Sequence, residues 1–166
     1  VLVDCGMVQG SRFSESLNEQ PFPFDLKELN AVIITHAHID HTGRLPKLCH
    51  DGYKGKIFAT APTIDFAHAL LLDSEHVIRM EAEREGGEPL YDIKDVERVF
   101  TQTEPVPYDQ YTILNDNISF CLRDAGHILG SAIVELFLKD GDKKRKIVFS
   151  GDLGNAPSPL VRDPFI

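Results

Sequence analysis

The chain has 166 residues, of which 42% are hydrophobic and 26% charged, and its 26 acidic and 17 basic residues give a formal net charge of −9 at pH 7. These proportions suit one ordinary globular domain, and the acidic balance argues against a simple basic groove for nucleic acid. No apolar run approaches the roughly 18 residues that a membrane-spanning helix needs, so we predict no membrane span.

The chain has three widely spaced cysteines, Cys5, Cys49 and Cys121, and no C-x-x-C pair. An odd number at this spacing argues against a disulfide-stapled scaffold and against an all-cysteine zinc site. We therefore expect three reduced thiols in a cytoplasmic protein.

Both ends of the chain are typical of a fragment. Residue 1 is Val, residues 1–3 have the character of a strand already begun, and the Pro-rich segment 155–160 leads to no capping element. We expect residues 1–166 to be the N-terminal part of one domain that lacks its first strands and a C-terminal segment.

Helices and strands are both predicted, and we take them in chain order. Strands are expected at residues 1–3, 31–35, 56–59, 118–122, 132–138 and 146–150, the last two as a hairpin around Asp140-Gly141-Asp142. Helices are expected over residues 45–49, from Pro62 to about Arg84, and from Asp92 through Phe100. The order of these elements predicts an α/β fold in which several strands end at polar residues.

The strand at residues 31–35 leads directly into His36-Ala37-His38-Ile39-Asp40-His41. In an extended segment, residues i and i+2 share a face, so His36 and His38 can bind one ion. Asp40 and His41 follow where the chain turns into a helix, and they suit a second ion nearby. Imidazole with carboxylate is the ligand set of catalytic zinc, with manganese or iron as alternatives.

Two later segments each place a ligand-type side chain beside glycine at a strand edge: Gly126-His127 and Gly151-Asp152. Asp4 is either a turn residue or an acceptor that orients a metal-bound histidine, and we favour the second role. The remaining histidines have no acidic residues at ligand spacing and are expected to be structural; they are His50, His68 and His76.

The segment Thr35 to Gly43 resembles the signature loop of the metallo-β-lactamase superfamily, and the resemblance extends from Asp4 to Asp152. Three details are similar to the β-CASP nucleases, the group that includes RNase J and the endonuclease of the cleavage and polyadenylation machinery. They are the opening Asp4-Cys5-Gly6-Met7-Val8-Gln9-Gly10, the context Gly126-His127-Ile128-Leu129-Gly130-Ser131-Ala132, and the long helical stretch between His41 and His127.

The resemblance implies a four-layer αββα sandwich of mixed sheets, incomplete in this chain, with a dinuclear zinc site. His36, His38 and His127 would bind one zinc, Asp40 and His41 the other, and Asp152 would bridge them. Asp4 would orient a ligand. In the family, a helical cap and one more histidine ligand come from beyond the position of residue 166, so we expect the second zinc site to be partly filled here.

The implied function is metal-dependent hydrolysis of RNA phosphodiesters to products with a 5′-phosphate, with Asp40 and Asp152 as the catalytic residues. We expect an RNA partner, no membrane and a cytoplasmic location, and we leave a homodimer open. A thioesterase similar to glyoxalase II and a non-catalytic scaffold subunit are the alternatives. Internal or terminal cleavage and RNA preference are left open too.

Overall fold

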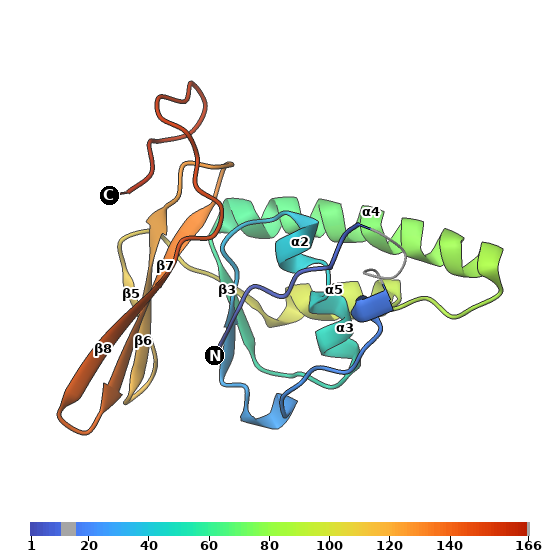
Figure 1. The fold of residues 1–166 in the computed structure, drawn as a ribbon, viewed down its shortest axis with the longest axis horizontal. Coiled ribbons are helices and arrows are strands. Elements are labelled where there is room, and N and C mark those ends of the chain that lie inside the picture. Colours follow the sequence, from blue (N-terminus) through green and yellow to red (C-terminus); the bar gives the residue numbers. More distant parts are fainter. Residues whose placement is uncertain (11–15, 166) are drawn as a thin grey trace.

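The structure, a computed structural model, describes residues 1–10 and 16–165. Two four-stranded sheets lie face to face, and the helices pack on the other side of the first sheet (Figure 1). In this described part of the chain, no helix has the length and apolar character needed to cross a bilayer. The predicted α/β fold with two sheets is confirmed.

The first sheet is parallel throughout, and its strands follow the order β1 (Leu2–Val3), β2 (Ala31–Ile33), β3 (Lys56–Ala59) and β4 (Thr103–Pro105). All three residues of β2 are completely buried. A parallel strand that is covered on both faces needs apolar residues at consecutive positions. This requirement explains the unbroken apolar run that predicts the strand.

Four α-helices follow β2 in the chain: α2 (Ile39–Thr42), α3 (Leu45–His50), α4 (Ala61–Glu85) and α5 (Ile93–Gln102). The Thr60 side chain accepts a hydrogen bond from the amide of Thr63 and caps the N-terminus of α4. Asp92 caps α5, and Asp95 bonds back to the amide of Asp92, which completes a capping box. The predicted limits of these last two helices are confirmed to within a few residues.

Two hydrophobic clusters hold the layers together. The first joins one face of the parallel sheet to the helices and includes Val32, Leu48 and Leu71, each completely buried. The second fills the space between the two sheets and includes Ile33 and Phe120. Because β2 contributes to both clusters, the loop that follows it starts from a strand that is packed on both faces.

The second sheet is antiparallel, and its strands are β5 (Tyr111–Asn115), β6 (Ile118–Asp124), β7 (Ala132–Asp140) and β8 (Lys143–Phe149). The predicted β7–β8 hairpin is confirmed, but β8 starts three residues earlier than expected, since Lys143 pairs with Asp140. Every residue of β8 is exposed. The basic residues at its start therefore show no hydrophobic alternation that would indicate a strand.

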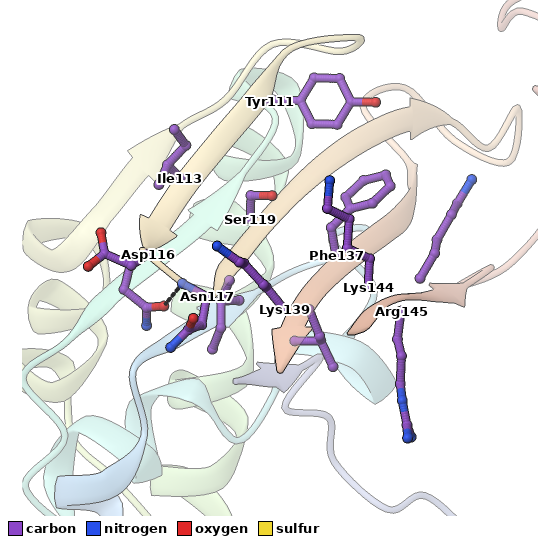
Figure 2. A pocket seen from close by; sticks show the side chains of 13 residues that line it. Tyr111, Ile113, Asp116, Asn117, Ser119, Phe137, Lys139, Lys144 and Arg145 are labelled. Atoms are coloured by element: carbon purple, nitrogen blue, oxygen red, sulfur yellow. Dashed lines mark hydrogen bonds between the residues drawn. The ribbon is translucent and has the colours of Figure 1, made fainter. Parts of the chain in front are cut away.

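The outer face of the second sheet carries no helix within residues 1–10 and 16–165, so the described part forms three layers of the four expected (Figure 1). Tyr111 and Phe137 lie on this face with ring centroids 5.3 Å apart. Figure 2 shows the groove that they line together with residues such as Ser119 and Lys139. The groove extends across all four strands, and its basic side chains come from β7 and β8.

The three cysteines are buried free thiols, as expected for reduced residues. Burial raises the pKa of Cys5 and of Cys49 to about 12. Both therefore stay protonated and inert at neutral pH.

Candidate metal centre

The loop after β2 brings the first two histidines together. The amide of Ile34 still bonds to β3, after which the chain leaves the sheet. His36 is completely buried, and its Nε2 lies 3.0 Å from Nδ1 of His38. The shared face predicted for residues i and i+2 is thus present.

Helix α2 places the next two candidates at the same edge. The Thr42 hydroxyl bonds to the carbonyls of Ala37 and His38 and holds the first turn in place. Nε2 of His41 lies 3.8 Å from Oδ2 of Asp40, whose side chain is 54% exposed. Asp40 and His41 therefore form a group beside the first two histidines, open to the outside on the Asp40 side.

The segment after β1 packs directly against α2. The amide of Cys5 bonds to the carbonyl of His41, and the amide of Met7 bonds to that of Ile39. A Cβ on Gly6 would lie 1.5 Å from the backbone oxygen of Asp40, so only glycine fits there. This contact explains the glycine of the opening motif.

His127 comes from the loop between β6 and β7, on the second sheet. The Ser131 side chain, which is completely buried, accepts hydrogen bonds from the amides of His127 and Ile128 and shapes this loop. Nε2 of His127 lies 3.3 Å from Nδ1 of His38. This role of Ser131 was not predicted from the sequence, in which the residue stands out only by its position four residues after His127.

Asp152 follows β8 and faces both groups of candidates. Its Oδ2 lies 3.8 Å from Nε2 of His36 and 3.7 Å from Nε2 of His127. Its Oδ1 lies 3.5 Å from Nε2 of His41. One carboxylate oxygen is thus directed to each group.

Ligand atoms of His36, His38, His127 and Asp152 all lie within 4.8 Å of one another. With bonds of about 2.0–2.1 Å, the donors of a tetrahedral zinc ion lie roughly 3.3 Å apart. Four of the separations in this group, from 3.0 to 3.8 Å, fall around that value. Three imidazoles and one carboxylate at these distances fit a divalent metal ion.

The protonation state of His36 also suits a ligand. Burial first, and then the neighbouring His41 and His38, together lower its pKa to about 4. His36 is therefore neutral at physiological pH, and one ring nitrogen has a free lone pair, as metal binding requires.

Asp4 lies at the end of β1 with a φ of 60°, a conformation that side chains other than Gly, Asn and Asp rarely adopt. Its Oδ2 lies 2.8 Å from Nδ1 of His41, and its Oδ1 accepts the amide of Thr35 at 2.8 Å. Burial raises the pKa of the Asp4 carboxyl, whereas the bonds from His41 and Thr35 lower it. The contact to His41 is the one expected of an acceptor that orients a ligand.

The other histidines lie away from this centre. His50 bonds to Asp95 at 2.9 Å, the His68 ring packs on Phe100, and His76 bonds to Arg79. These contacts are those of structural residues, as predicted.

Two facing sheets, helices on the first sheet and a group of histidine and carboxylate donors at the edge of the sheets define this domain. The metallo-β-lactamase superfamily domain matches residues 1–153, and the chain belongs to this superfamily. The expected family resemblance is confirmed.

Curated relatives match nearly the whole chain. Ribonuclease TTHA0252 of Thermus thermophilus is 40% identical over 164 residues, which cover 99% of this chain and 35% of that protein. Transcription termination factor FttA of Cenarchaeum symbiosum is 39% identical over 155 residues, 92% of this chain and 23% of that protein. The chain thus spans about a third or less of these relatives.

Solved structures show the same fold. A subclass B3 metallo-β-lactamase with an active-site glutamic acid matches with a TM-score of 0.53 at 15% identity, over 95% of this chain and 56% of that one. BJP-1 of Bradyrhizobium japonicum matches with a TM-score of 0.50 at 19% identity, over 98% and 55% of the two chains.

Proposed function

We propose that this chain provides the metal-binding part of a hydrolase that cleaves RNA phosphodiester bonds. The observation that carries the proposal is the position of Asp152, with one oxygen toward His36 and His127 and the other toward His41. A carboxylate placed in this way suits a bridge between two ions. The relatives named above as a ribonuclease and as transcription termination factors favour RNA over a small molecule.

In this proposal, His36, His38 and His127 hold one zinc ion, Asp40 and His41 hold a second, and Asp152 binds both. Manganese or iron would suit the same donors. When bound, such a pair of cations supplies an activated water and neutralises charge on the phosphate. The second group has fewer donors among the described residues, so we expect it to bind its ion more weakly.

The protein side chains have separate tasks around the reacting phosphate. Asp152 lies between the His36–His127 group and His41 and connects the two groups. Its side chain is 46% exposed and can accept a hydrogen bond from the attacking water. Asp40 is the more exposed acid, so we expect the substrate to enter on its side. His41 is held in position by Asp4.

The thioesterase alternative shares the fold and the donors, but relatives that are 34 to 40% identical to this chain have names from RNA cleavage and transcription termination. The scaffold alternative predicts no need for metal. A cytoplasmic location stays a prediction from the sequence, and a homodimer stays open.

Two measurements test the proposal. Zinc content and affinity are measured on this chain, with His76→Ala as a control variant outside the centre. Cleavage is measured with the protein expressed at the full length that its gene encodes, on a 5′-labelled single-stranded RNA and on a thioester. We expect zinc-dependent RNA cleavage that a chelator abolishes. Thioester turnover with intact RNA would reject the proposal, and a chain that binds no zinc would support the scaffold.

A further inference from the structure

Thr35 lies in the centre without belonging to the metal donors. It is 1% exposed. Its hydroxyl oxygen lies 2.8 Å from Oδ2 of Asp4, 3.0 Å from Nδ1 of His36 and 3.5 Å from Nδ1 of His41. A single hydroxyl thus connects the carboxylate of Asp4 to histidines of both groups.

The donors and acceptors in this arrangement can be assigned from their chemistry. A carboxylate oxygen only accepts, so the Thr35 hydroxyl donates its one hydrogen to Asp4. The hydroxyl oxygen can then only accept from His36, whose Nδ1 must carry the hydrogen. The reverse assignment would place two acceptors, Asp4 Oδ2 and Thr35 Oγ1, 2.8 Å apart with no hydrogen between them.

The two histidines are therefore oriented by the same acid. Nδ1 of His41 donates to Asp4 directly. Nδ1 of His36 donates to the Thr35 hydroxyl, which in turn donates to Asp4. In both rings, Nε2 then has the free lone pair. These are the same nitrogen atoms that face the two oxygens of Asp152.

Three chain segments hold Thr35 in this position. Its amide donates to Oδ1 of Asp4, and its carbonyl accepts the amide of Ala132 at 2.7 Å. A Cβ on Gly151, which has a φ of 54°, would lie 2.8 Å from Cβ of Thr35. Thr35 is therefore in contact with the strand of Asp4, the start of β7 and the residue before Asp152.

We propose that Thr35 is a positioning residue that connects Asp4 to His36. Through this contact it fixes the tautomer of His36 that carries its hydrogen on Nδ1 and leaves Nε2 free for metal. The proposal rests on the proposed function of this centre as a metal site. In this arrangement, Asp4 sets the tautomers of both His36 and His41, which face different oxygens of Asp152.

The test uses Thr35→Val, which keeps the branched shape without the hydroxyl, and Thr35→Ser, which keeps the hydroxyl. The matched control is Thr103→Val, because the Thr103 hydroxyl donates to the carbonyl of Val99, away from the centre. Zinc affinity is measured by competition with a chromophoric chelator. We expect an affinity loss of about 10- to 100-fold for Thr35→Val, the range found when a group that orients a ligand is removed. Thr35→Ser and Thr103→Val should stay near the wild type.

The histidine tautomers are measured on the metal-free protein by long-range proton–nitrogen NMR of the side chains. We expect the hydrogen of His36 on Nδ1 in the wild type and in Thr35→Ser, and a mixture of forms in Thr35→Val. A wild-type His36 with its hydrogen on Nε2 would overturn the proposal without any variant, even if Thr35→Val failed to fold. A loss of zinc affinity in Thr35→Val with an unchanged tautomer of His36 would also overturn the proposal, since Thr35 would then have only a structural role.

Failure of the proposed function gives a different result. If the wild type bound zinc and the Thr35 variants behaved as expected while RNA stayed intact, the proposal for Thr35 would hold and the RNA assignment would fail. If RNA were cleaved with wild-type zinc affinity in Thr35→Val, the proposal for Thr35 alone would fail.

Discussion

Nε2 of His127 lies 3.3 Å from Nδ1 of His38, although 89 residues separate the two in the chain. His38 follows a strand of the parallel sheet, and His127 follows a strand of the antiparallel sheet. The donor group is thus formed at one edge where the two sheets meet. It depends on the packing between the sheets as well as on the signature loop.

Replacing His127 should remove one of the four donors and weaken zinc binding by at least about 100-fold, more than the loss of a supporting group costs. His127→Ala is the variant, with zinc affinity measured by chelator competition. His50→Ala is the control, because His50 is an exposed histidine bonded to Asp95 on another part of the fold. Equal zinc affinity in the two variants would contradict the donor role of His127.

Asp4→Asn should reduce zinc affinity by about 10- to 100-fold while the protein stays folded. Asn tolerates the φ of 60° at this position, so the backbone is not strained. The amide cannot replace the charge that orients His41. Circular dichroism measures the fold and chelator competition the affinity. An unchanged affinity would mean that Asp4 only shapes the turn.

The metal-free chain should lose stability as the pH falls. The folded protein holds the pKa of His36 at about 4, against an ordinary value of 6.5. Below pH 6.5 the unfolded chain binds a proton that the folded chain excludes, so the free energy of unfolding decreases toward pH 4. Between pH 8 and 5 this residue contributes about 2 kcal/mol of that decrease.

Urea unfolding in the presence of a chelator, at several pH values, measures this effect. The His36→Gln variant removes the titrating group, and its stability should therefore fall less steeply over the same range. Parallel curves for the wild type and the variant would contradict the lowered pKa of His36.

Much of this centre could be predicted from local sequence, because the information lies within short segments. The apolar run before His36 marks a buried strand, and the alternation of His36 and His38 marks their common face. Asp92 identifies the start of α5 for a similar reason, since a cap acts within three residues.

The remainder depends on contacts between distant segments, which no single stretch shows. The early start of β8 at Lys143 follows from pairing with β7 and not from its own exposed residues. The hydroxyl of Thr35 gains its importance only because Asp4 and Gly151 arrive beside it from other strands. The hydrogen bonds of Ser131 in the His127 loop likewise depend on the folded conformation of that loop, which its sequence does not show.

The role proposed for Asp152 is to join the two groups of metal donors in a centre that hydrolyses RNA. Asp152→Asn tests this role in the protein at its full encoded length, with metal content and cleavage of single-stranded RNA measured on the same sample. We predict that cleavage falls by at least about 1000-fold and that bound metal decreases, since a bridging charge is lost. RNA cleavage at the wild-type rate with normal metal content would contradict this role.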